Sequence, residues 1–143
     1  MIAKHHNLIV SLACRVMAPF IFLFGIYIVL FGHYSPGGGF QGGTILAADV
    51  ILMRLCLGRQ ATYKKFPPQM GLVLGAIGVL IYGGTGLVAM LAGGNFLDYS
   101  YLPIPGMSPV DRRYYGILFV EIGVALGVFG VLLSIFDSLT KEK

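Results

Sequence analysis

The stretch HYSPGGGFQGG, residues 33–43, lies between two long apolar segments and decides how this chain folds. It holds five of the chain's 21 glycines and one of its seven prolines. A soluble protein uses such a loop to cradle a phosphate, whereas a membrane protein uses it to turn one helix back against another. The segments on either side distinguish these two interpretations.

Composition identifies the class of protein. Apolar residues make up 57% of the 143 residues, charged residues make up 11%, and the mean hydropathy is +0.84. Soluble domains contain about 25% charged residues, so this chain cannot build a water-facing surface. Four segments reach the length of about 20 residues that a membrane helix needs, and they lack the alternation of strands. We predict an all-α integral membrane protein, a single membrane domain with four transmembrane helices at residues 8–32, 40–57, 71–92 and 114–136.

The distribution of positive charge predicts the orientation of these helices. Basic residues gather on the cytoplasmic side of membrane proteins. Eight of the ten Lys and Arg residues belong to the two termini, the 58–70 segment or the adjoining helix ends. We therefore expect both termini in the cytoplasm, with residues 33–43 and 93–113 facing outward. The eight are Lys4, Arg15, Arg54, Arg59, Lys64, Lys65, Lys141 and Lys143, and the other two are Arg112 and Arg113.

The sequence argues against phosphate, haem and nucleic-acid binding. The glycine stretch has no GK[ST] sequence and no preceding strand, which argues against a phosphate loop. The two cysteines form no CxxC pair, and the three histidines lie at or beyond the helix ends, where they cannot hold a haem inside the bilayer. The net charge of +4 follows from the orientation signal and indicates no nucleic acid. We expect no cofactor, no metal site and no enzymatic activity of the chain itself.

Two opposite charges fall at similar depth in the first two predicted helices. Arg15 lies about 10 Å from the start of its segment, and Asp49 lies about 12 Å from the end of the next. An unpaired charge at such a depth costs at least about 2.5 kcal/mol. One interpretation is that Arg15 and Asp49 pair. The other is that Arg15 extends to the lipid headgroups while Asp49 meets a partner subunit. Arg54, nearer the helix end, is interpreted as a positive anchor.

Glu121 is the single acidic residue expected inside the fourth helix, and no basic residue of the chain is expected at its depth. Such a carboxylate is a candidate functional site. We expect it to face the first or second helix or another protein, and we favour another protein. A protonated Glu121 hydrogen-bonded within the chain is the alternative. Glu121, Asp49 and Arg15 are therefore the candidates for an ion route or a subunit contact.

Glycines at helical spacing predict which helices touch. Gly116, Gly123, Gly127 and Gly130 are seven, four and three residues apart, which places them on one helix face. A similar small face on residues 71–92 predicts that the third and fourth helices pack together. In the opening stretch, Pro36 ends a helix and Gly37, Gly38 and Gly39 permit positive φ. Gly39, Gly43 and Ala47 then form a small stripe that a close helix or an incoming chain would cover.

These residues carry a resemblance to a known family. SPGGGFQGG after a helix ending FGIYIVLFGH, with FVEIGV in the last helix, resembles the B subunit of Mrp-type multi-subunit cation/proton antiporters. It also resembles the homologous subunit of membrane-bound hydrogenases and related respiratory complexes. The likeness covers most of the chain. The residues that match the family's turn are His33, Pro36, Gly37, Gly38, Gly39, Phe40, Gly42 and Gly43, and Glu121 falls where relatives are acidic.

The chain departs from this family at two places. Asp49 stands where relatives more often have a small apolar residue, so the resemblance implies no role for it. The 93–113 loop is less recognisable, and we expect either a subunit contact there or no special role.

The resemblance implies a non-catalytic, multi-pass subunit in a prokaryotic cell (inner) membrane. Its partners would be the lipid bilayer and the other membrane subunits of a hetero-oligomeric complex that exchanges Na⁺ for H⁺. The subunit would structure the membrane arm, with Glu121 as the candidate to line an ion route. Two alternatives stay open: the same module coupled to a hydrogenase or related redox complex, and a purely structural assembly scaffold.

Overall fold

A computed structural model describes residues 8–32, 34 and 37–140 of the chain. Its described elements are five α-helices and one short 3₁₀-helix, η1. In chain order they are α1 (Leu8–Phe31), α2 (Gly39–Leu57), α3 (Arg59–Tyr63), α4 (Pro68–Leu91), η1 (Tyr99–Tyr101) and α5 (Pro109–Leu139).

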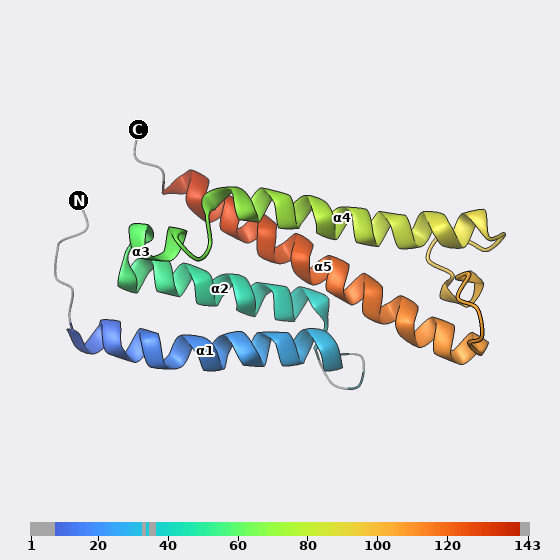
Figure 1. The fold of residues 1–143 in the computed structure, drawn as a ribbon, viewed down its shortest axis with the longest axis horizontal. Coiled ribbons are helices and arrows are strands. Elements are labelled where there is room, and N and C mark those ends of the chain that lie inside the picture. Colours follow the sequence, from blue (N-terminus) through green and yellow to red (C-terminus); the bar gives the residue numbers. More distant parts are fainter. Residues whose placement is uncertain (1–7, 33, 35–36, 141–143) are drawn as a thin grey trace.

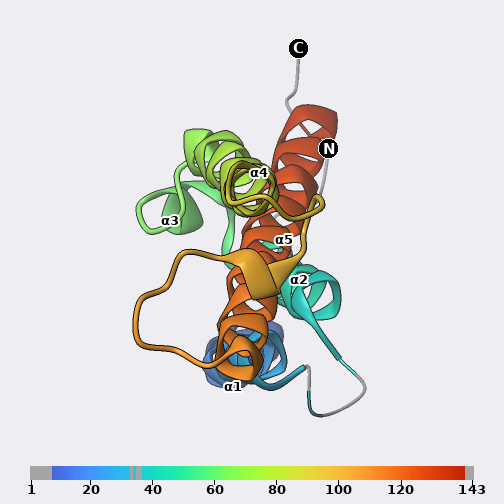
Figure 2. The same ribbon diagram turned by 90° about the vertical axis from the view of Figure 1, so that its right-hand side faces the viewer.

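The four long helices form a bundle in which α5 is central (Figure 1). Helix α5 packs against α4 on one side and α2 on the other, and α1 packs mainly against α2. The first residue of α1 and the last residue of α5 lie at the same end of the bundle, beside α3 (Figure 1). The view along the bundle shows α1 and α4 on opposite sides of α5, with the 93–108 loop at the near end (Figure 2).

All four long helices are long and apolar enough to cross a membrane. Four such helices were predicted, and α1 and α2 match their predicted ranges to within one residue. Helices α4 and α5 begin three and five residues earlier than expected, each with Pro as its first residue. Proline suits this position because its missing N–H has no partner there anyway. At α5 the Ser108 side chain also accepts a hydrogen bond from the Asp111 N–H, a standard cap.

The contact between α4 and α5 is made by glycines, as predicted. A methyl group added to Gly78 would lie 2.5 Å from the Gly123 carbonyl oxygen, so the two backbones touch directly. Gly130 fits in the same way against Gly71 and Gly75. Gly116 was expected on the same contact face, but it packs against the Tyr99 side chain of η1 rather than against α4. Small residues allow this close approach, which replaces the hydrophobic driving force that a bilayer does not supply.

The loop between α4 and α5 folds back onto the helices. Phe96 packs over Gly86 and lies edge-on to Tyr82, with ring centroids 6.3 Å apart. Asp98 begins η1 by accepting a hydrogen bond from the Ser100 N–H at 3.3 Å. The loop thus closes one end of the α4–α5 pair within the chain itself. A subunit contact by this loop stays a prediction.

Candidate functional site

The glycine turn and Glu121 come together in one junction. Gly39, the first residue of α2, lies against the main chain of Glu121, where an added Cβ would come within 2.9 Å of the Glu121 carbonyl carbon. Gly38 stands at φ 148°, a conformation that favours glycine. Its own Cβ position lies 3.5 Å from Glu121 Oε1. We call Gly38, Gly39 and Glu121 the turn junction.

The next two glycines of the motif fix α2 between two other helices. A Cβ on Gly43 would lie 2.6 Å from the Ala125 carbonyl oxygen of α5. A Cβ on Gly42 would lie 3.0 Å from the Gly25 carbonyl oxygen of α1. The small stripe predicted at the start of α2 is therefore covered by α5, a helix of the same chain. Phe40, by contrast, is 64% exposed.

We expected Glu121 to face the first or second helix or another protein. In the structure its carboxylate faces the start of the second helix, α2, and the residue is partly buried. Contact with another protein at the remaining exposed part stays a prediction. Of the three glycines that permit positive φ in the turn, Gly38 has it and Gly37 and Gly39 do not. His33 and Pro36, which the resemblance also assigns to the turn, lie outside the described residues.

The structure does not contain the proposed pair of Arg15 and Asp49. Asp49 is only 1% exposed, and within the part of the chain that the structure describes neither carboxylate oxygen has a hydrogen-bond partner. Arg15 is exposed on α1. Both residues nevertheless line one hollow of about 660 Å³, together with Lys65. The two residues share a depth, as predicted, but no ion pair between them is present among the described residues.

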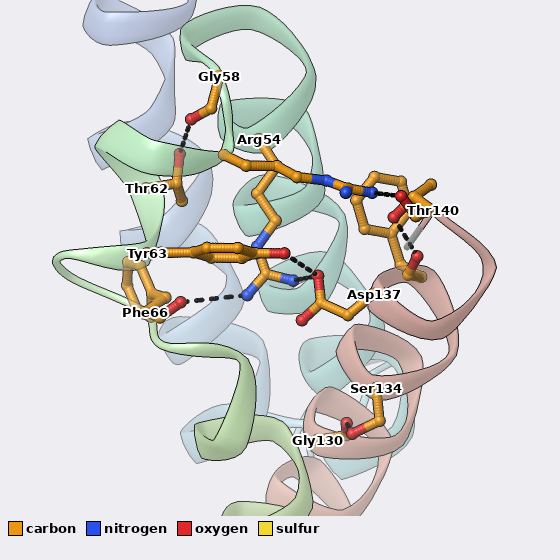
Figure 3. A network of polar contacts seen from close by, with 11 residues as sticks. Arg54, Gly58, Thr62, Tyr63, Phe66, Gly130, Ser134, Asp137 and Thr140 are labelled. Carbon is orange, nitrogen blue, oxygen red and sulfur yellow. Dashed lines mark hydrogen bonds and ion pairs between the residues drawn. The ribbon is translucent and has the colours of Figure 1, made fainter. Parts of the chain in front are cut away.

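A different ion pair holds the α3 end of the bundle together (Figure 3). Arg54 of α2 donates from Nη1 to Asp137 Oδ1 of α5, and their side chains are 1% and 6% exposed. Arg54 Nη2 also donates to the Phe66 carbonyl oxygen at 3.2 Å, and the Tyr63 hydroxyl donates to Asp137 Oδ1 at 3.2 Å. The guanidinium carbon lies 5.1 Å from the centre of the Tyr63 ring, a cation–π distance. This network links α2, α3 and α5.

Sequence reasoning missed this pair for an identifiable reason. It placed the end of the last helix at residue 136, one residue before Asp137, and it interpreted Arg54 as a positive anchor at the end of its helix. That interpretation is wrong, because Arg54 is 3% exposed and paired. The available signal was that Arg54 and Asp137 carry opposite charges at the same predicted end of the bundle.

No group of three or more His, Cys, Asp or Glu side chains could hold a metal ion within the described ranges 8–32, 34 and 37–140. Three polar features remain as candidates for function: the turn junction, the Arg54–Asp137 network and the Asp49 hollow. All three lie between helices that are apolar enough to span a membrane. Carboxylates in such positions bind protons, cations or basic side chains.

Comparison with known proteins covers almost the whole chain. The family described as "Domain related to MnhB subunit of Na+/H+ antiporter" matches residues 9–134. The B subunit of the Na(+)/H(+) antiporter of Bacillus subtilis (strain 168) is 30% identical over 144 residues, covering 98% of this chain and 97% of that protein. The putative antiporter subunit mnhB2 of Staphylococcus aureus (strain Newman) is 28% identical over 141 residues and covers 96% of both chains.

Proposed function

Because the chain belongs to the family of domains related to the MnhB subunit of Na⁺/H⁺ antiporters, we propose that it is a non-catalytic membrane subunit of an Mrp-type Na⁺/H⁺ antiport module. Its role would be to structure the membrane arm of the complex and to contribute Glu121 to an ion route. The observation that carries this proposal is the family match over residues 9–134, which includes both the turn and Glu121.

The turn junction supports the role of Glu121. Glu121 belongs to a helix that is long enough to span a membrane, and its carboxylate lies close to the glycine backbone of the turn. A hard oxygen ligand at such a place suits a proton or Na⁺, and the nearby main chain of the turn can hold its position. The Arg54–Asp137 network, at the opposite end of α2 and α5, would keep these helices aligned while ions move.

The expected environment follows from the charge distribution and the family. The α3 end, which contains Lys64 and Lys65, would face the cytoplasm with both termini, and the turn junction would face outward. The membrane would be the prokaryotic inner membrane. The partners would be other membrane subunits of the module, which would carry the main proton path. We assign the chain itself no enzymatic step.

One second candidate has a specific basis. The opening resemblance applies equally to the corresponding subunit of membrane-bound hydrogenases and related respiratory complexes. In that setting the same chain would couple a redox reaction to ion movement. The names of the relatives, which specify antiporters, favour the first candidate.

Purification of the intact complex tests the proposal directly. The chain would carry a small tag, the membranes would be dissolved in mild detergent, and co-purifying proteins would be identified by mass spectrometry. We expect other antiporter subunits. Hydrogenase or iron–sulfur proteins in the complex would establish the redox-coupled alternative. Recovery of the chain alone, as a homo-oligomer, would refute both.

The role of Glu121 has its own test. Glu121→Gln keeps the size of the side chain but removes its charge, so we expect weaker Na⁺-dependent proton exchange in membrane vesicles with the complex still intact. Asp111→Asn is the matched control, because Asp111 lies exposed in the first turn of the same helix. Full exchange activity in an intact Glu121→Gln complex would rule out the ion-route role and leave a structural one.

A further inference from the structure

The most informative feature outside the turn junction is the hollow beside Asp49. Among the described residues, the carboxylate is 1% exposed and neither of its oxygens has a hydrogen-bond partner. The hollow measures about 660 Å³, and Asp49 is one of its walls. Buried polar groups are almost always paired, so one without a partner requires an explanation.

The lining of the hollow restricts what its ligand can be. Most of the other walls are apolar, among them Pro19, Phe22, Met53 and Phe66. A hard cation such as Na⁺ or Ca²⁺ needs several oxygen ligands, and a single carboxylate among apolar side chains does not supply them. A proton needs only one acceptor. The composition of the walls therefore favours a proton over a metal ion.

Two basic side chains line the same hollow. Arg15 on α1 and Lys65, just before α4, both line it, and both side chains are exposed. Long basic side chains turn readily between solvent and a neighbouring carboxylate. Two thiols are also near: Cys14 of α1 is close to Asp49, and Cys56 of α2 is close to Cys14. Asp137, the nearest described acid at this end of the bundle, is already paired with Arg54.

We propose that Asp49 is a proton-binding site that exchanges its proton with water through this hollow, on the side of the membrane where Arg15 and Lys65 lie. In the neutral form, Asp49 needs no counter-charge, which agrees with its lack of an ion-pair or hydrogen-bond partner among the described residues. In the ionised form, Arg15 turns inward and compensates the carboxylate. The pairing considered from the sequence alone is then one of two states rather than a permanent bond.

Carbodiimide labelling tests this proposal on the whole complex in membrane vesicles. Dicyclohexylcarbodiimide adds to a protonated carboxyl group and rearranges to a stable N-acylurea, which mass spectrometry locates on the peptide. We expect Asp49 to be labelled at acid pH and to lose labelling, through a single midpoint, as the pH rises. Labelling at this position should fall to background in Asp49→Asn. Asp137 should stay unlabelled in the same samples, because its carboxylate is buried and bound by Arg54 and the Tyr63 hydroxyl.

Substitutions at the rim supply the second readout. Arg15→Gln removes a positive charge that favours the ionised form, so the midpoint should move upward by about one pH unit. Arg113→Gln is the matched control, since it removes the same charge at the other end of the bundle and should leave the midpoint unchanged. An Arg15→Gln midpoint equal to that of the unmodified chain would refute the assigned role of Arg15.

Access of the reagent is measured separately at Met53, another wall of the hollow. A Met53→Cys variant, in a chain without its native cysteines, is treated with a small maleimide. If this cysteine reacts while Asp49 is never labelled, Asp49 is permanently ionised and paired with a basic group of a neighbouring subunit, and the proposal fails. If neither reacts, the hollow is closed in the complex and exchange through it fails too. Labelling that is complete at every pH would show a permanently neutral group and would also overturn the proposal.

This inference goes beyond the proposed antiport role, because the labelling reports protonation in whichever complex contains the chain. Loss of the Asp49 signal would leave the antiport proposal untouched. Conversely, a redox-coupled complex could retain a proton-exchanging Asp49. The two proposals therefore fail by different measurements.

Discussion

Replacing Gly78 by alanine is the sharpest test of how this bundle is held together. The added methyl group would lie 2.5 Å from the Gly123 carbonyl oxygen and 2.9 Å from the Gly127 Cα, whereas ordinary contact begins at 3.4 Å. Helices α4 and α5 must then separate locally by about 1 Å, because backbone atoms cannot rotate away as a side chain can. Overpacking of this kind costs about 1–3 kcal/mol. We expect the free energy of unfolding of Gly78→Ala to fall by that amount.

Gly83 provides a matched control on the same helix. A Cβ at Gly83 meets nothing within 4 Å of the described chain. Its replacement by alanine should leave stability unchanged or raise it by up to about 1 kcal/mol, the usual helix preference for alanine over glycine. The two variants would be compared by titrating the purified chain from mild detergent into sodium dodecyl sulfate, with far-ultraviolet circular dichroism as the signal. Equal unfolding midpoints would refute direct backbone contact between α4 and α5.

Two further predictions concern the ends of the helices. Arg54→Met leaves Asp137 buried without its partner and should lower the free energy of unfolding by about 3–5 kcal/mol, while the double variant Arg54→Met, Asp137→Leu should recover most of that loss in the same titration. A double variant no more stable than the single one would contradict a simple ion-pair role. Ser108→Ala removes the cap of α5 and should lower the free energy of unfolding by about 1 kcal/mol. Ser108→Asn keeps a good capping side chain and should lower it by less. Equal losses in the two variants would show that the Ser108 side chain does not stabilise the helix.

The network at Arg54 also bears on how the chain responds to its surroundings. The ion pair is almost completely screened from solvent, with side chains 1% and 6% exposed. Salt in solution weakens exposed pairs far more than buried ones. The α3 end of the bundle is therefore expected to keep its arrangement across a wide range of ionic strength, which is useful in a protein whose proposed module moves ions.

The membrane spans and the α4–α5 contact were predictable because their signals are local. Span length depends on an unbroken run of apolar residues, which is counted directly along the chain. Glycines such as Gly123 and Gly130 indicate a packing face by their spacing alone. The short α3 helix and η1 were not predicted, because they are five and three residues long and carry no periodicity that a pattern could detect.

The partners of the polar side chains could not be predicted in the same way. Each residue along a helix turns the side chain by about 100°, so a small error in helix rotation or length changes the neighbour completely. This is why Asp137 was left outside the last helix and why Arg54 was interpreted as an anchor. It is also why equal depth of Arg15 and Asp49 did not establish that they pair.

The amino-acid sequence predicted four apolar helices, a glycine turn between the first two, and a resemblance to a family of antiporter subunits. It did so because hydropathy, glycine spacing and the motif at residues 33–43 are properties of the chain read in one dimension. Three features became evident only in the folded structure: the turn rests on Glu121, Arg54 binds Asp137, and Asp49 is buried without a partner among the described residues. Those facts depend on the rotation and crossing of helices, which are set by packing between segments far apart in the chain.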